Sequence, residues 1–164
     1  MTTFLSASLW YFSDQSIKID YSQKIEKLVK AGNYKDVFIH LSDYPLAKKS
    51  GTDQVVVKLF SFDCRSNVYP TREILQKIDD RGYRPADLYE LLSYKLQNPK
   101  PGKNILALGS VSESSSHPYR KYSPYIQLFV DENNQLKYRL SEAHEWMGNY
   151  ICDGEEVEFL AVSK

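Results

Sequence analysis

The chain of 164 residues contains little of what marks disulfide scaffolds, nucleotide-binding proteins or metal sites. Its two cysteines, Cys64 and Cys152, are too few for a disulfide framework, and their separation matches no metal-ligand pattern. The seven glycines are scattered, so neither a phosphate-binding loop nor a dinucleotide fingerprint is present. A Cys64–Cys152 bridge stays open, although unpaired thiols are the ordinary state in a reducing compartment.

The chain also lacks an excess charge of either sign, since 21 basic residues balance 21 acidic ones. This balance gives no electrostatic basis for binding nucleic acid or an anionic membrane. No apolar run approaches the length of a membrane span, so we expect no membrane insertion. Residues 1–12 have no basic leader and are typical of a first strand rather than a signal peptide, so the expected location is cytoplasmic.

Helix patterns lie in the first part of the chain. Asp20 and Gln23 form a candidate capping box before an apolar stripe that ends at Gly32. Thr71 is a candidate N-cap for a second segment whose apolar residues recur with helical spacing. A further helix is expected to open at Pro85, with three leucines on its core face: Leu88, Leu91 and Leu92.

Strand patterns are clearest at residues 54–62 and 157–162. Residues 125–130 and 136–140 alternate around turn residues 131–134, which predicts a hairpin, and residues 105–111 predict one more strand. Residues 112–124 and 141–156 show no period and are expected to be irregular. We therefore predict a single α+β domain over residues 1–164, with two helices, short antiparallel sheets and a long irregular C-terminal region.

No group of residues indicates catalysis. The three histidines are His40, His117 and His144, and the position four after His144 is Gly148, which excludes the paired-histidine zinc motif. Gly109-Ser110 lacks the remainder of a nucleophile elbow. We therefore expect neither an enzyme nor a metal or cofactor site.

Tyrosine is unusually abundant, with thirteen residues against seven phenylalanines. The stretch 112–125 combines Ser, His, Tyr, Arg and Pro, and is too irregular to bury and too aromatic for a plain linker. Tyrosine and serine together are typical of antibody loops, where the ring supplies contact area and the hydroxyl adapts its hydrogen bonds. An ordinary solvated loop is the alternative. The composition favours a binding surface in the C-terminal half.

The segment Gly82–Leu92, with the strand at 105–111, Trp146 and the closing strand at 159–162, resembles C-type-lectin-like domains related to the formylglycine-generating enzyme. In particular it is similar to the variable proteins of diversity-generating retroelements. The resemblance implies a scaffold in residues 1–104 and a variable ligand-binding half in residues 105–164. In such systems, substitution at template adenines lets asparagine codons reach Ser, Tyr, His and Asp.

The resemblance thus implies ligand-binding residues of these reachable types in the C-terminal half, and a target that is a protein. They are Ser112, Ser114, Ser115, Ser116, His117, Tyr119, Tyr122, Tyr125, His144, Asn149 and Tyr150.

The sequence also departs from these families. The Glu-Pro-Asn and Gln-Pro-Asp signatures of calcium-dependent sugar binding are absent, as is the lectin cysteine framework. We therefore expect no calcium site, and no cysteine pair like that of formylglycine-generating enzymes. Two alternatives stay open: a small enzyme with a dispersed site that uses Cys64 and a histidine, and a phage-associated structural interaction domain.

Overall fold

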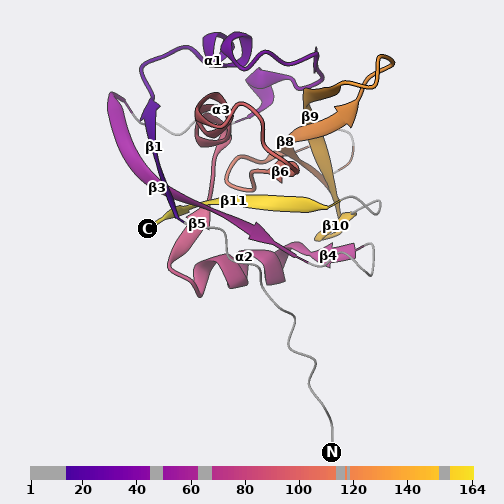
Figure 1. Cartoon of the computed structure of the whole chain (residues 1–164). Helices are drawn as coiled ribbons and strands as arrows, with labels where there is room; N and C mark the ends of the chain where they lie inside the picture. Colours follow the sequence, from indigo (N-terminus) through magenta and orange to yellow (C-terminus); the bar gives the residue numbers. More distant parts are fainter. Residues whose placement is uncertain (1–13, 45–49, 63–67, 114–116, 118, 152–155) are drawn as a thin grey trace, which may run out of the picture.

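The computed structural model describes residues 14–44, 50–62, 68–113, 117, 119–151 and 156–164. Within these residues the chain forms one mixed sheet of eleven strands with three short α-helices (Figure 1). The strands are β1 (Gln15–Asp20), β2 (Asp36–Val37), β3 (Thr52–Ser61), β4 (Val68–Pro70), β5 (Tyr83–Pro85), β6 (Asn104–Leu106), β7 (Ser112–Glu113), β8 (Arg120–Val130), β9 (Leu136–Trp146), β10 (Asn149–Ile151) and β11 (Val157–Ser163). The helices are α1 (Ile25–Ala31), α2 (Thr71–Asp79) and α3 (Leu88–Gln97), with a 3-10 turn η1 at Leu41–Asp43.

The strand order interleaves both halves of the chain. It runs β1-β3-β11-β6-β8-β9-β10-β4, and β2, β5 and β7 add to β9, β11 and β8. The final strand β11 therefore lies inside the sheet, antiparallel to β3 and parallel to β6. The predicted scaffold half and the predicted binding half share one sheet.

The expected fold class is wrong. A large sheet dominates the molecule, and the C-terminal region is ordered rather than irregular, because β8 and β9 each extend over eleven residues. The hairpin predicted at residues 125–140 is confirmed, but its strands continue through residues expected to be irregular, such as Ser141–Trp146. The structure gives no support to a lectin-like arrangement of two helices with short sheets.

The helices cover opposite faces of the sheet. In Figure 1, α1 and α3 lie on one side and α2 on the other. Beneath α1 and α3 is the α3-side core, which includes Ile17, Ile105, Ile126 and Leu140. Beneath α2 is the α2-side core, and its buried members are Phe60, Ile74, Ile78, Leu106, Leu108, Tyr150, Phe159 and Ala161.

Helix α3 begins at Leu88 rather than at Pro85, which belongs to β5. Asp87 is its N-cap, and its carboxylate accepts a hydrogen bond from the Glu90 N–H at 2.9 Å. The Glu90 carboxylate in turn accepts one from the Asp87 N–H at 2.8 Å, which completes a capping box. The three expected core leucines are fully buried, so that prediction is confirmed.

The other two predicted caps are wrong. Asp20 ends β1 and holds a turn, accepting hydrogen bonds from the Ser22 N–H and the Gln23 side chain at 3.0 Å each. Helix α1 starts later, at Ile25, and ends at Ala31, with Gly32 as its C-cap as expected. Thr71 is already the first residue of α2, and its hydroxyl donates instead to the buried Glu145 carboxylate at 2.8 Å.

Gly109 and Ser110 have a structural role at the start of α3. A Cβ on Gly109 would lie 2.6 Å from the Ala86 carbonyl oxygen, and the Gly109 N–H donates to that same oxygen. Ser110 is buried, and its hydroxyl accepts from the Leu88 N–H at 2.9 Å. These two residues therefore link the chain after β6 to the start of α3 through hydrogen bonds.

Candidate functional site

Several of the predicted binding residues meet where β8 begins, beside the turn from β9 to β10. That turn has two residues, Met147 and Gly148, both with positive φ (50° and 81°), between Trp146 and Asn149, which pair with each other. This geometry is typical of a tight hairpin turn whose twist matches the strands. The Met147 N–H donates to the Tyr119 carbonyl oxygen at 3.3 Å, so the segment before β8 is attached to the turn.

The side chains on this turn are well exposed. Tyr119 is 72% exposed and Met147 is 68% exposed, the two highest values for large hydrophobic side chains in the described part of the chain. Asn149 donates from its side-chain amide to the Met147 carbonyl at 3.2 Å. Two exposed side chains, an aromatic ring and a thioether, therefore stand on backbone segments that a hydrogen bond joins at this turn.

A tyrosine–histidine pair lies a short distance along the same strands. Tyr122 on β8 is opposite His144 on β9, and their rings meet edge to face with centroids 4.8 Å apart. His144 is exposed and Tyr122 is half-buried. We call Tyr119, Tyr122, His144, Met147 and Asn149 the turn surface.

The remaining predicted residues lie elsewhere. Tyr150 is 3% exposed in the α2-side core, and its hydroxyl lies 2.6 Å from the Ser123 hydroxyl. Tyr125 packs against the same core, and Ser112 is buried in β7. His117 is exposed next to Tyr119, and its carbonyl accepts from the Arg120 N–H at 2.9 Å. Ser114, Ser115 and Ser116 lie outside the described residues.

The alternation of side chains along a strand explains why some of the predicted residues lie on the turn surface and others do not. Residues of opposite parity on β8 point to opposite faces of the sheet, so Tyr122 and Tyr125 cannot share a face. Tyr125 and Tyr150 therefore do not join the turn surface. Met147 was missed because a single methionine carries no motif, although Gly148 after it could have indicated a two-residue turn.

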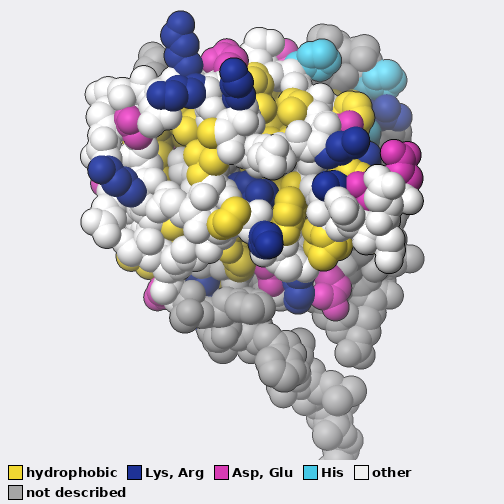
Figure 2. Space-filling view, turned by 45° about the horizontal axis from the view of Figure 1, so that its top comes forward, with side chains coloured by type: hydrophobic (Ala, Val, Ile, Leu, Met, Phe, Trp, Pro, Cys, Tyr) yellow, Lys and Arg dark blue, Asp and Glu magenta, His cyan; other side chains and the backbone are white. Residues whose placement is uncertain are grey.

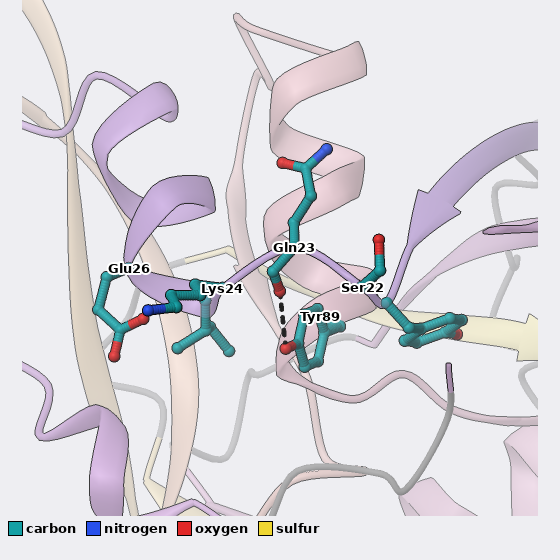
Figure 3. Close-up of a pocket in the computed structure, with 7 residues that line it drawn as sticks. Ser22, Gln23, Lys24, Glu26 and Tyr89 are labelled. Carbon is teal, nitrogen blue, oxygen red and sulfur yellow. Dashed lines mark hydrogen bonds between the residues drawn. The ribbon is translucent and has the colours of Figure 1, made fainter. Parts of the chain in front are cut away.

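A separate hollow lies between the start of α1 and α3 (Figure 3). It has a volume of about 440 Å³ and is lined by residues 21–26 and Tyr89. Both tyrosine hydroxyls are occupied, since Tyr89 donates to the Gln23 carbonyl at 3.0 Å and Tyr21 to the Glu90 carboxylate at 3.1 Å. The hollow thus has walls that are partly polar and partly apolar, and both of its tyrosine hydroxyls are engaged in hydrogen bonds.

A buried carboxyl lies at the start of β11. Glu158 is 4% exposed, and burial raises the pKa of its carboxyl, while the Ser61 hydroxyl donates to it at 3.2 Å. The Lys103 ammonium lies 3.8 Å from the same oxygen. Cys64 and Cys152 lie outside the described residues, and so does the predicted dispersed site that would use Cys64.

Across the described ranges, no group of three His, Cys, Asp or Glu side chains is placed to hold a metal ion. No helix among them is long and apolar enough to cross a membrane, and the longest, α3, has ten residues. Figure 2 shows acidic and basic side chains interspersed on one face of the molecule, without a large area of one sign.

Comparison with known proteins gives no relative: no family model matches the chain, and neither a curated protein nor a solved structure is significantly similar to it.

Proposed function

We propose that this chain is a binding module that recognises a protein target through the turn surface. The observation that carries this proposal is the position of its two most exposed large hydrophobic side chains among the described residues. A hydrogen bond joins the backbones of Tyr119 and Met147, and each of them lies three residues along the chain from one member of the Tyr122–His144 pair. Tyrosine and methionine are both enriched where proteins meet.

The surroundings of the turn surface support this role. Four of its residues stand on β8, β9, β10 and the tight turn between β9 and β10, and the Tyr119 carbonyl just before β8 accepts from the Met147 N–H of that turn, so little backbone freedom is lost when a partner binds. Tyr122 and His144 are already in contact, which limits the loss of side-chain entropy. A small apolar centre with a polar rim is the usual composition of a protein contact surface.

A displayed library of random peptides tests this role without a known target. Peptides are selected on the immobilised chain and then measured against the double variant Tyr119→Ser with Met147→Asn. We expect the selected peptides to bind the variant at least tenfold more weakly, since hot-spot truncations cost about 1.4 kcal/mol or more. Asparagine suits the positive φ at position 147, so the turn is kept.

The matched control is Leu136→Ser, which removes another exposed apolar side chain, at the opposite end of β9 from the turn surface. This variant should bind the selected peptides as the wild type does. Failure to enrich any peptide would contradict the proposal, as would peptides that bind the double variant and the wild type equally.

Diversification by a retroelement stays a prediction. It requires a reverse-transcriptase gene and a near-copy of the final coding segment beside this gene. Variation should then concentrate at exposed positions such as Tyr119 and His144, because Tyr150 is buried and its replacement would disturb the core. Sequencing the gene's surroundings checks this, and the absence of both features would remove the retroelement reading while leaving the peptide test unaffected.

A further inference from the structure

Strand β3 has one side that its neighbour β1 covers only in part. Strand β1 begins at Gln15, opposite Val57, whereas β3 continues to Ser61. On its other side β3 pairs with β11 from Val57 to Ser61, so that side is complete. Among the described residues, no strand pairs with the β1 side of β3 beyond Val57 (Figure 1). We call residues 58–61 along this side the open edge.

The hydrogen-bonding groups of the open edge follow from the register of the two strands. The Tyr21 N–H donates to the Gly51 carbonyl at 2.8 Å, one step beyond the last pair of β1 and β3. Because hydrogen-bonded pairs alternate along an antiparallel ladder, the odd-numbered residues of β3 direct their N–H and C=O groups towards β1. Leu59 and Ser61 therefore direct theirs to the same side, beyond the start of β1.

The chain before β1 already enters this register. Continuing the pairing of β1 with β3 by one step places Asp14, the first described residue, opposite Lys58. The Lys58 ammonium donates to the Asp14 carboxylate at 3.0 Å and lies 5.5 Å from the centre of the Tyr83 ring. Directly opposite residues on one face of a sheet make such contacts. Asp14 thus lies where the next residue of the strand is expected.

The sequence before Asp14 suits the open edge. The first strand expected over residues 1–12 lies outside the described residues, and its last residues include Trp10, Tyr11 and Phe12, which are types favoured in strands. The same register assigns residues 11–13 one partner each on the open edge: Ser13 with Leu59, Phe12 with Phe60 and Tyr11 with Ser61.

We propose that residues 11–13 of the same chain dock on the open edge and extend β1 towards the N-terminus. The backbones of Ser13 and Tyr11 then exchange hydrogen bonds with those of Leu59 and Ser61. Phe12 pairs across the strands with Phe60, a buried member of the α2-side core. The docked segment covers an edge whose unpaired backbone groups would attract the strand of another chain.

The covalent connection favours this segment over a second copy as the occupant. Residues 11–13 follow directly from Asp14 without a linker, and a strand advances about 3.3 Å per residue, so three residues reach the end of β3. A segment tethered in this way has an effective concentration on the order of millimolar, well above that of a second copy in a micromolar solution.

Nuclear magnetic resonance of the full chain tests the proposal. Phe12 and Phe60 form a pair without mutual hydrogen bonds, in which the two Cα atoms approach most closely, so an Overhauser contact between their Cα hydrogens is expected. The amides of Leu59 and Ser61 should exchange with solvent at least tenfold more slowly in the wild type than in Ser13→Pro. Proline has no N–H to donate to the Leu59 carbonyl, so docking is lost.

The matched control is Ser6→Pro, the same substitution outside the docked segment, which should keep the wild-type exchange rates. In both variants the amide of Ile126, in the middle of the sheet, should stay slow, which establishes that the fold is intact.

Three results would overturn the proposal. Leu59 and Ser61 amides that exchange equally fast in the wild type and in Ser13→Pro would show that the open edge is unoccupied. Equally slow exchange in both would show that another group protects these amides. A Phe12–Phe60 contact found only between labelled and unlabelled copies in a mixture would make a second copy the occupant. Peptide binding by the turn surface should be unchanged in Ser13→Pro, so the two proposals fail separately.

Discussion

Replacing Glu90 by alanine should lower the free energy of unfolding by about 3 kcal/mol, the lower end of the range for breaking a buried ion pair. Glu90 is fully buried, and its carboxylate accepts two hydrogen bonds from the Arg84 guanidinium, at 2.9 and 2.6 Å. It also accepts from the Tyr21 hydroxyl and the Asp87 N–H. The variant leaves all these donors without their acceptor. The lower end applies because the Arg84 side chain is 34% exposed and can turn towards water.

Urea unfolding at neutral pH measures this loss, and the chain offers a closely matched control. Glu73 is also the third residue of its helix, in α2, but it is exposed. Glu73→Ala should change the free energy of unfolding by no more than about 0.5 kcal/mol. If the two variants lost similar amounts of unfolding free energy, the buried hydrogen bonds around Glu90 would contribute no more to stability than an exposed glutamate does.

The network around Glu90 was visible in the sequence only in part. The leucines at positions 88, 91 and 92 lie on one helical face, so the buried side of α3 could be predicted. The capping box could also have been read from Asp87 and Glu90, three residues apart. The pairing with Arg84 and Tyr21 could not, because Tyr21 lies 69 residues away from Glu90 and reaches it only in the folded sheet.

The long hairpin could have been predicted more fully. On β8 every even-numbered residue from Tyr122 to Val130 is apolar, which is the pattern of a strand with one buried face. Pro124 and the polar neighbours Lys121 and Ser123 suggested a loop instead. On β9 the pattern is interrupted at Glu142 and His144, where one face becomes more exposed. The alternation of apolar residues on β8 therefore predicted the strand correctly, whereas the polar residues and Pro124 led to the wrong prediction of a loop.

The order of the strands and the exposure of individual tyrosines could not be predicted from the local sequence pattern. Strand β11 pairs with β3 and β6, which are about 100 and 50 residues earlier in the chain, so no local signal fixes its place. Tyr119 and Tyr150 are the same residue type in neighbouring segments, yet one is solvated and the other packs near Phe159. Only the tertiary structure determines which tyrosine is exposed for binding and which is buried in the core.

Buried tyrosines should make this chain unfold steeply in alkali. Burial raises the pKa of the hydroxyls of Tyr21, Tyr44 and Tyr150 far above the ordinary value of 10.0, and nearby carboxylates add to the effect at Tyr21 and Tyr44. Below pH 10 these groups are protonated in both states, so their contribution to stability is complete. Above pH 10 only the unfolded chain ionises them, so each lowers the free energy of unfolding by about 1.4 kcal/mol per pH unit.

Three such groups together give a loss of about 4 kcal/mol per pH unit, which would exhaust the 5–15 kcal/mol of an ordinary domain within a few pH units. Lys95 acts in the opposite direction. Burial lowers the pKa of its amine below the ordinary 10.5, so its cost to stability fades as the pH rises towards that value. One opposing group does not offset three, and above pH 10.5 it contributes no further change.

Circular dichroism and tyrosinate absorbance, followed together above pH 9, check this expectation, and both signals should change in one transition. Tyr150→Phe should reduce the slope by about 1.4 kcal/mol per pH unit, while costing about 1 kcal/mol at neutral pH through the lost bond to Ser123. Tyr119→Phe is the control, because that ring is solvated in the folded chain, and it should keep the wild-type slope. Ionisation of all thirteen tyrosines while the sheet signal persists would show that these hydroxyls are open to solvent, which would contradict the packing of Tyr21 and Tyr44 in the α3-side core and of Tyr150 in the α2-side core.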